Sequence, residues 1–290
     1  MTGRLRIAVC TNRTPAEAAE SLAALREQVP AEALAVVTSG LPAAAASGFE
    51  GTVLVEPRSG LSRARNRALD WCSEDDVLAF VDDDAVVDSG WFAGLSRAWE
   101  EADAELACIG GPIRPRWPAG GPPAWVSEPI LPTLTLLDLG PEPRDLDPLV
   151  TTVFGANISF RVSALRRIGG FDPAFGHSRD RIFFSEEDEA QRALARLGYR
   201  VGYVPDAAVE HVIPPSRLTR ASFVRRRFAY GMTLGVRGAR PVSLAARQAV
   251  SSGLGTVPAV GRQKLLMERA VRAAENLGVL YGSTRPRRIA

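Results

Sequence analysis

Aspartates gather in the segment LAFVDDDAVVDSGWF, residues 78–92, as Asp82, Asp83, Asp84 and Asp88. The four apolar residues before Asp82 indicate a buried strand, and strands disfavour aspartate. Neighbouring like charges raise each other's pKa unless a cation or hydrogen-bond donors compensate. Aspartate is also common in turns, where its side chain bonds the backbone two residues on. Three acids in succession favour a cation site. The alternative is that they only stabilise a turn through hydrogen bonds to the backbone.

The alternation of side chains along an extended chain bears on which acids share a site. Successive side chains of a strand point to opposite faces, so Asp82 and Asp84 would face one site while Asp83 points away. Hard divalent cations such as Mg²⁺ or Mn²⁺ take one or two carboxylates, with phosphates and water completing the shell. This pattern therefore predicts a divalent metal held by Asp82 and Asp84.

A second cluster of acids opens a predicted helix: Glu186, Glu187, Asp188 and Glu189. The segment 183–200 has apolar residues at helical spacing, with Ser185 suited to the N-cap and Gly198 to the position just past the end. Acids in a first turn are favoured by the helix dipole, which is a sufficient structural reason for some of them. Four exceed what capping needs, so one of them is a candidate general base.

Histidine and arginine supply the remaining candidates. The chain has only two histidines, His177 and His211. His211 follows an apolar strand predicted at 200–205, and its spacing alone leaves a core, surface or ligand role open. Arg225 is the first of three successive arginines on a predicted helix, of which at most one or two can face one site. An arginine there could clamp phosphate bidentately.

The elements that must position these residues alternate between strands and helices. Apolar runs predict strands at 5–10, 34–37, 52–55 and 77–81, and helical patterns occupy 61–71 and a segment that begins near Pro15. The start at Pro15 follows from a capping box of Thr14 and Glu17. Alternation of this kind predicts a mostly parallel sheet with right-handed crossovers. Ligands of such sheets bind beyond the carboxyl ends of the strands, where Asp82 and Asp84 fall.

Two further segments carry less information. Residues 112–150 are rich in Pro, Gly, Arg and Trp, which predicts no long helix or regular strand there. Trp117 and Trp125 indicate an ordered flap, with a plain surface loop as the alternative. A helix predicted at 262–282 carries an apolar stripe of Leu265, Leu266, Ala270, Val271, Ala274 and Leu277. We expect core or dimer packing there, with membrane docking as the minority alternative.

Composition narrows the class of protein. The chain of 290 residues is 46% hydrophobic, enough for one large α/β domain with or without a small attachment. Its formal net charge of +2 argues against a nucleic-acid coat. Three widely spaced cysteines, Cys10, Cys72 and Cys108, are read as reduced core residues. Without a leader or a long uncharged span in the sequence, we expect a cytoplasmic protein.

Segments in fixed order resemble the inverting enzymes of glycosyltransferase family 2, over roughly residues 5–235. They are IAVCTNRTP, GLSRARNRAL, FVDDDAVVDSGW, FGANISFRVSALRRIGGFDP, SEEDEAQRALARLGYRVGYVPDA and VEHVIPP. The resemblance implies the nucleotide-diphosphosugar transferase (GT-A) fold, a Rossmann-like α/β fold with a mixed, mostly parallel sheet flanked by helices. It implies a catalytic domain at 1–235, with a nucleotide-binding half at about 1–111 and an acceptor-binding half at about 112–235. A helical extension follows at 236–290.

The resemblance also assigns roles to single residues. Asp82 and Asp84 match the family's DxD motif, and His211 matches a further metal ligand. In the family the general base is often the Asp of a Glu-Asp pair. Counting back from Gly198, Glu187 falls at the position of that Asp, whereas a literal Glu-Asp pair selects Asp188. We favour Glu187. Nucleotide and donor contacts fall on Thr11, Asn12, Arg13, Arg65, Asn66, Asp82, Asp83, Gly155 and Asn157, with Arg225 as a candidate phosphate clamp.

One departure from the family pattern concerns the nucleotide base. Many relatives carry an acid after the second strand, where this chain has Thr38 and Ser39. The nucleobase of the donor therefore stays open, and the candidates are UDP-, GDP- and dTDP-sugars.

The implied reaction is glycosyl transfer from a nucleotide-diphosphosugar to an acceptor hydroxyl with inversion. Mn²⁺ or Mg²⁺ would neutralise the leaving diphosphate while the base removes the acceptor proton. The acceptor would be a glycan, a lipid-linked sugar or a small molecule, and not a nucleic acid. A homodimer and peripheral attachment to the inner face of a membrane stay open. Competing interpretations are a metal-dependent nucleotidyltransferase and a noncatalytic sugar-nucleotide-binding or interaction module.

Overall fold

The chain is divided into two compact units. The computed structural model describes residues 3–41, 48–174, 177–178, 181–182, 186–237, 245 and 262–284. The first unit comprises Met1–Pro115, Leu136–Arg179 and Glu186–Val212, and the second comprises Arg116–Thr135, Asp180–Ser185 and Ile213–Ala290. The functional division at about 111 and 235 stays a prediction.

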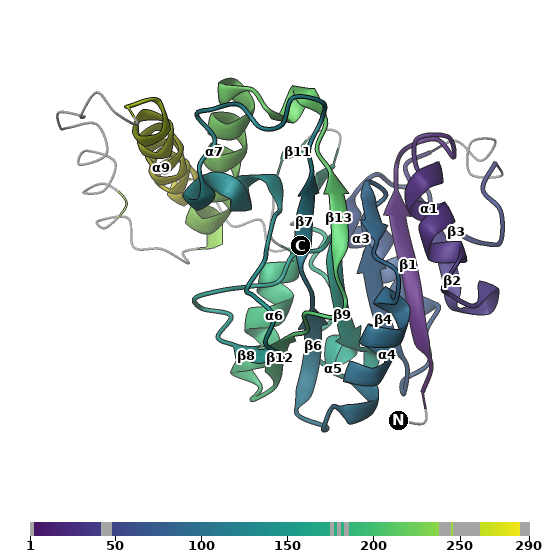
Figure 1. Cartoon of the computed structure of the whole chain (residues 1–290). Coiled ribbons are helices and arrows are strands. Elements are labelled where there is room, and N and C mark those ends of the chain that lie inside the picture. Colours follow the sequence, from purple (N-terminus) through teal and green to yellow (C-terminus); the bar gives the residue numbers. More distant parts are fainter. Residues whose placement is uncertain are drawn as a thin grey trace. The chain divides into compact units, whose positions relative to one another are not determined.

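An eight-stranded sheet organises the first unit (Figure 1). Its order is β3-β2-β1-β4-β9-β6-β12-β8. The strands are β1 Leu5–Thr11, β2 Leu34–Ser39, β3 Thr52–Glu56, β4 Val77–Val81, β6 Leu106–Gly110, β8 Arg144–Leu146, β9 Asn157–Arg161 and β12 Arg200–Tyr203. The first four strands are parallel, and β9 runs antiparallel between β4 and β6. The mixed, mostly parallel α/β sheet is confirmed, with each predicted strand within two residues of its observed bounds.

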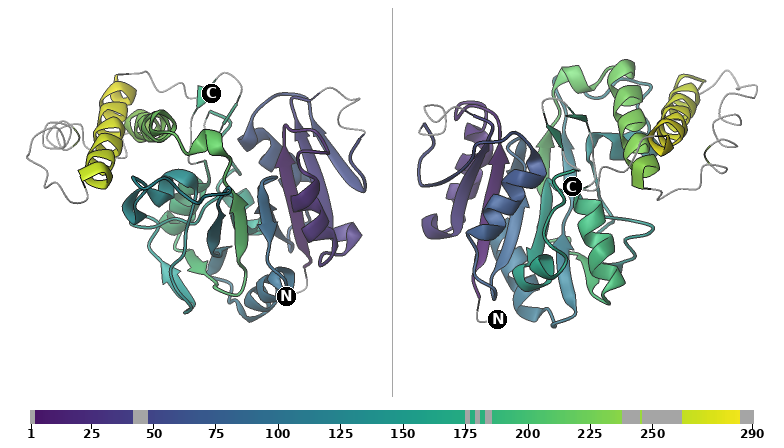
Figure 2. Two further views of the ribbon diagram at one scale, coloured as in Figure 1. Left: turned by 45° about the horizontal axis from the view of Figure 1, so that its top comes forward. Right: turned by 180° about the vertical axis from the view of Figure 1, so that it is seen from behind.

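Helices cover both faces of this sheet. They are α1 Ala19–Arg26, α3 Leu61–Asp70, α4 Trp91–Glu101, α5 Val162–Arg167 and α6 Glu186–Arg196. Residues of α3, α5 and α6 share one core cluster with Phe80 and Phe160, so these helices lie on one face, seen from behind in Figure 2. On the other face, Trp91 and Trp99 of α4 donate hydrogen bonds to side chains of β9. Because both faces are covered, every residue of β4 is buried, which explains its uninterrupted apolar sequence.

The predicted start of the first helix is wrong by about four residues. The Thr14 N–H does donate to the Glu17 carboxylate (2.9 Å), as a capping box requires. However, the N–H groups of Glu17 and Ala18 both bond the Thr14 carbonyl, so a single turn closes there. The regular helix α1 then begins at Ala19.

A small sheet contradicts the prediction that residues 112–150 hold no regular strand. It has the order β5-β13-β7, with β5 at Ala85–Val87, β13 at Val209–Val212 and β7 at Ile113–Arg116. β7 tolerates Pro115 because it lies at an edge, where a missing N–H costs no ladder bond. The same region also contains β8 and the 3-10 helix η2, Glu128–Leu134.

The second unit is built mainly from α7, Arg220–Arg237, and α9, Arg262–Ser283, with the short 3-10 helix η3 at Pro215–Arg217 before them. A Cβ atom on Gly231 would lie 1.9 Å from the Glu275 carbonyl, and one on Gly278 2.1 Å from the Phe228 carbonyl. Only glycine permits the two backbones to approach this closely. Trp125 is buried in the same unit, edge-to-face with Phe223 at 5.1 Å between ring centroids.

The predicted apolar stripe of the last helix is only partly right. Val271 and Ala274 are buried, but Leu266 and Leu277 are exposed. The glycines of α9 face α7, because only a residue without a Cβ atom lets the two helix backbones approach so closely. No helix of the described residues combines the length and the apolar character needed to span a membrane. All three cysteines are free thiols; Cys72 and Cys108 are buried in the core as predicted, whereas Cys10 is only half-buried.

Candidate functional site

The three consecutive aspartates form a turn at the carboxyl end of β4, which we call the acid turn (Asp82, Asp83 and Asp84). The Ala85 N–H donates to the Asp82 carbonyl at 3.0 Å, so the chain is not extended here. The predicted alternation, with Asp83 pointing away from Asp84, is therefore wrong. Asp83 and Asp84 both contact the Arg13 guanidinium, at 3.4 Å and 2.8 Å.

Two contacts from distant segments hold the acid turn. The Ser21 hydroxyl of α1 donates to the Ala85 carbonyl at 2.6 Å. The Val212 N–H of β13 donates to the Asp84 carbonyl at 2.9 Å. Sequence reasoning missed Ser21, because a single serine on a helix carries no recognisable signal.

The loop after β1 lies beside the acid turn because β1 and β4 are parallel neighbours. The Thr11 hydroxyl donates to the Asp83 carboxylate, and the Arg13 N–H donates to the Thr11 oxygen at 3.0 Å. Burial raises the pKa of Asp83 to about 6, although Thr11 and Arg13 oppose this rise. Burial, followed by the charge of Asp84, raises the pKa of Asp82 as well. Asn12 is exposed.

His211 completes the donor set at the acid turn. Its partner on β5 in the small sheet is Ala85, and its Nε2 atom lies 3.3 Å from Asp84 Oδ1. Carboxylates suit Mg²⁺ or Mn²⁺, and histidine is the commonest metal ligand. Within the described residues, no group of three or more ligand-type side chains is arranged to hold a metal. Asp84 and His211 could together supply two ligands of a divalent ion, because such ions commonly take one or two carboxylates and fill the remaining positions with phosphate and water oxygens.

The second acidic cluster begins α6, and two of its four acids contact a buried arginine. Arg65 of α3 is 2.6 Å from Glu186 and 3.5 Å from Glu187. The side chain of Glu186 is 3% exposed and that of Glu187 15%. Burial and the charge of Glu186 raise the pKa of Glu187 to about 7, against the lowering effect of Arg65. The Gly155 N–H donates to Glu187 at 3.3 Å.

Arg65 is held as a fixed cation. Its guanidinium lies over the rings of Phe80 and Phe171, 5.4 Å and 5.6 Å from their centroids. The adjacent acids raise its pKa even though burial alone would lower it. A Cβ atom on Gly155 would lie 1.9 Å from a guanidinium nitrogen of Arg65, so this position requires glycine.

Asp188 has a different environment from Glu187. It is buried and accepts a hydrogen bond from the Thr152 hydroxyl at 2.6 Å. The predicted cap at Ser185 lies outside the described residues. Beyond the helix, Gly198 adopts a φ of +87°, so its predicted place just past the end is confirmed.

Other predicted site residues are engaged within the fold. The Asn66 amide both donates to and accepts from the backbone of Phe171, at 2.7 Å and 2.8 Å. Asn157 accepts from Trp91 at 3.0 Å and donates to two backbone carbonyls, at 3.1 Å and 2.7 Å. Arg225 lies exposed on α7 of the second unit. The structure therefore brings together the acid turn, Thr11, Arg13 and His211, and places Arg65, Gly155 and Glu187 around one another.

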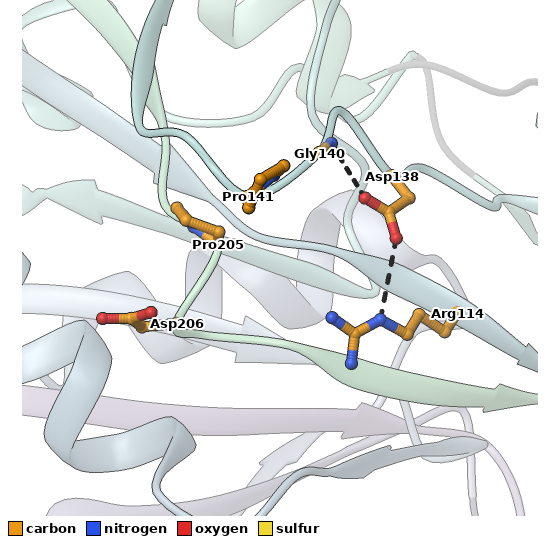
Figure 3. Close-up of a pocket in the computed structure, with 6 residues that line it drawn as sticks. All are labelled: Arg114, Asp138, Gly140, Pro141, Pro205 and Asp206. Atoms are coloured by element: carbon orange, nitrogen blue, oxygen red, sulfur yellow. Dashed lines mark hydrogen bonds and ion pairs between the residues drawn. The ribbon is translucent and has the colours of Figure 1, made fainter.

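A separate hollow of about 420 Å³ contains none of these residues. Figure 3 shows its lining: Arg114, Asp138, Gly140, Pro141, Pro205 and Asp206. Arg114 contacts Asp138 at 3.6 Å and also Asp88, the fourth acid of the opening segment, at 3.2 Å. Asp88 is thus part of a surface ion-pair group.

Two proteins of similar sequence were found. The chain is 29% identical over 252 residues to the succinoglycan biosynthesis protein ExoM of Rhizobium meliloti, covering 81% of this chain and 75% of that protein. It is 27% identical over 156 residues to the glucosyl-dolichyl phosphate glucuronosyltransferase of Haloferax volcanii, covering 52% of this chain and 47% of that protein. The match thus spans about half the length of the second relative.

Solved structures share the fold at low sequence identity. The mannosyltransferase PcManGT from Pyrobaculum calidifontis, in complex with GDP-Man and Mn²⁺, matches with a TM-score of 0.55 and 19% identity, over 93% of this chain and 72% of that one. GalNAc-T7 with UDP, GalNAc and Mn²⁺ matches with a TM-score of 0.57 and 14% identity, over 92% and 54%. These likenesses establish the GT-A fold.

The sequence model named Glycosyl transferase family 2 matches residues 7–169, more than half of the chain. This range contains most of β1, the helix that carries Arg65, the acid turn and Gly155. The chain belongs to glycosyl transferase family 2.

Proposed function

We propose that this protein transfers a glycosyl group from a nucleotide-diphosphosugar to an acceptor hydroxyl, with inversion and with a divalent metal. One observation carries the proposal: Val81, just before the acid turn, pairs with Asn157 of β9, and Gly155, two residues before Asn157, donates its N–H to Glu187 at 3.3 Å. The acids suited to a metal and the acid suited to a base therefore belong to one site. That site lies at the carboxyl end of β4, as expected for a ligand site of a parallel sheet.

At the donor side, Asp84 and His211 would hold the metal, with Asp82 as a neighbouring carboxylate. A divalent ion held by these residues would supply positive charge to the leaving diphosphate. Thr11, Asn12 and the backbone around them would line the nucleotide. The two solved structures named above contain Mn²⁺ and a nucleotide or nucleotide sugar, which supports the same donor class here.

At the acceptor side, we assign the base to Glu187. Its pKa of about 7 leaves a large ionised fraction at neutral pH and makes it a competent proton acceptor. It takes the proton of the acceptor hydroxyl while that oxygen attacks the anomeric carbon from the face opposite the diphosphate, which inverts the configuration. Asp188 instead anchors the start of α6 through Thr152. A glycan or lipid-linked sugar is the proposed acceptor, because the relatives are named for succinoglycan biosynthesis and for glucosyl-dolichyl phosphate.

Calorimetric titration tests the donor half of this proposal. UDP, GDP, dTDP and CMP are titrated with and without Mn²⁺ into the wild type and Asp84→Asn. We expect one nucleoside diphosphate to bind with metal and to lose at least about tenfold in affinity without it or in Asp84→Asn, because a metal ligand is removed. Asp138→Asn makes the same chemical change in the separate hollow and should bind like the wild type. Absence of metal-dependent binding to all four nucleotides would refute the metal-dependent transfer and favour a noncatalytic module.

A further inference from the structure

We propose that Arg13 is the resident counter-ion of the acid turn in the metal-free protein, and that it exchanges the carboxylates for a diphosphate when metal and nucleotide bind together. This inference rests on the proposed function. Its consequence is that the metal alone binds weakly, and that metal and nucleotide strengthen each other's binding.

The contacts of Asp84 define the exchange. One of its oxygens, Oδ1, lies 3.3 Å from His211 Nε2, and the other, Oδ2, lies 2.8 Å from Arg13 Nη2. The Nε of Arg13 is in turn 3.4 Å from Asp83 Oδ1. A guanidinium thus lies between the adjacent carboxylates of Asp83 and Asp84, on the Asp84 oxygen that does not face His211. Such carboxylates repel one another unless a positive charge lies beside them.

Arg13 differs from the other arginine near the site in how readily it can leave. Its side chain is 34% exposed, whereas that of Arg65 is 2% exposed. Removing Arg65 from its acids would strand buried charges, which is strongly unfavourable. Arg13 itself can turn towards solvent or a ligand at little desolvation cost, but the Asp83 and Asp84 side chains, 11% and 9% exposed, then need another cation beside them, which the metal supplies. Arg65 is therefore the fixed cation of the site and Arg13 the exchangeable one.

The backbone around Arg13 is already held, so only its side chain must move. The Arg13 N–H donates to the Thr11 oxygen at 3.0 Å, and the next residue, Thr14, donates its N–H to Glu17 at 2.9 Å. A long side chain that pivots on a fixed backbone can leave the acid turn without disturbing β1.

Charge balance explains why the exchange needs both ligands. A divalent ion at Asp84 would stand beside the guanidinium and repel it, so the metal alone must displace Arg13 without offering it a partner. A diphosphate supplies that partner, because guanidinium binds phosphate oxygens bidentately. With both ligands present, the metal neutralises the carboxylates and Arg13 the phosphates. Each ligand then raises the affinity for the other by the same factor.

Direct Mn²⁺ binding tests the inference without any turnover. Free Mn²⁺ is measured by electron paramagnetic resonance with the wild type, Arg13→Gln and Arg13→Lys, first without nucleotide and then with UDP and with GDP. We expect Arg13→Gln to bind Mn²⁺ alone about tenfold more tightly, and the coupling between Mn²⁺ and nucleotide to fall by a similar factor. Arg13→Lys keeps the positive charge and should bind Mn²⁺ alone much as the wild type does.

Arg58→Gln is the matched control. Arg58 is ion-paired with Glu56 at 3.0 Å, away from the acid turn, so the same substitution should leave Mn²⁺ binding unchanged. Unchanged or weaker Mn²⁺ binding by a folded Arg13→Gln would overturn the inference while leaving the metal site in place. A wild type that binds no Mn²⁺ even with UDP or GDP would instead refute the proposed metal-dependent function.

Discussion

Replacing Glu187 with Gln should lower kcat by about 10²–10⁴-fold, the usual contribution of a general base. Glutamine keeps the size of the side chain and the acceptor for the Gly155 N–H, but it cannot take a proton. The affinity for metal and nucleoside diphosphate should stay close to that of the wild type. Initial rates with a verified donor and acceptor, together with calorimetric titration of the nucleotide, measure the two effects separately.

Asp188→Asn is the matched control for this substitution. Because Asp188 accepts a hydrogen bond from Thr152 and is buried, we expect a loss of stability of about 1–3 kcal/mol. Its kcat should remain within about tenfold of the wild type, since a general base contributes more than that. If Asp188→Asn abolished turnover and Glu187→Gln retained it, the assignment of the base would be reversed.

The pH dependence of kcat/KM should report the same group. Burial and the neighbouring Glu186 raise the pKa of Glu187 to about 7. A base works only when deprotonated, so the rate should rise with pH through about 7 and level off above it. The rising limb should disappear in Glu187→Gln at saturating metal. A rising limb that persisted unchanged in Glu187→Gln would show that another group is the base.

Local patterns predicted β1, β2, β3, β4 and β12 of the eight-stranded sheet, but not β6, β8 or β9. The runs that became β1 and β4 are apolar and bounded by polar residues, and Gly198 marks the end of α6 through its left-handed backbone. These features depend on neighbours in the sequence. The acids that follow β4 and those that begin α6 could also be predicted, because each group is adjacent in sequence to an element with a clear local pattern.

Contacts between distant segments could not be predicted. The turn at Asp82 depends on Ser21 and on β13, so reasoning from an extended chain misplaced Asp83. The pairing of Arg65 with Glu186 joins residues 121 positions apart and has no local signature. Asn66 and Asn157 match donor-binding segments of the family, but their amides hydrogen-bond within the fold. Their proposed role in donor binding would therefore be indirect.

Replacing Arg65 with Met should destabilise the first unit by about 3–5 kcal/mol, as expected when one partner of a buried ion pair is removed. Methionine retains an apolar stem between Phe80 and Phe171, so the loss comes chiefly from the stranded carboxylate of Glu186. Equilibrium denaturation, followed by near-ultraviolet circular dichroism, measures the change. A variant as stable as the wild type would mean that Glu186 regains solvent or a proton at little cost.

Combining Arg65→Met with Glu186→Gln separates the two roles of the arginine. The double variant has no stranded charge, so we expect it to recover to within about 2 kcal/mol of the wild type. The activity profile adds a second readout, because Arg65 lowers the pKa of Glu187 and Glu186 raises it. The rising limb should therefore move to higher pH in Arg65→Met and return towards the wild-type position in the double variant. Recovery of stability in the double variant, together with a limb that does not move in Arg65→Met, would show that Arg65 supports the fold but does not tune the base, since only the second role acts through the charge on Glu187.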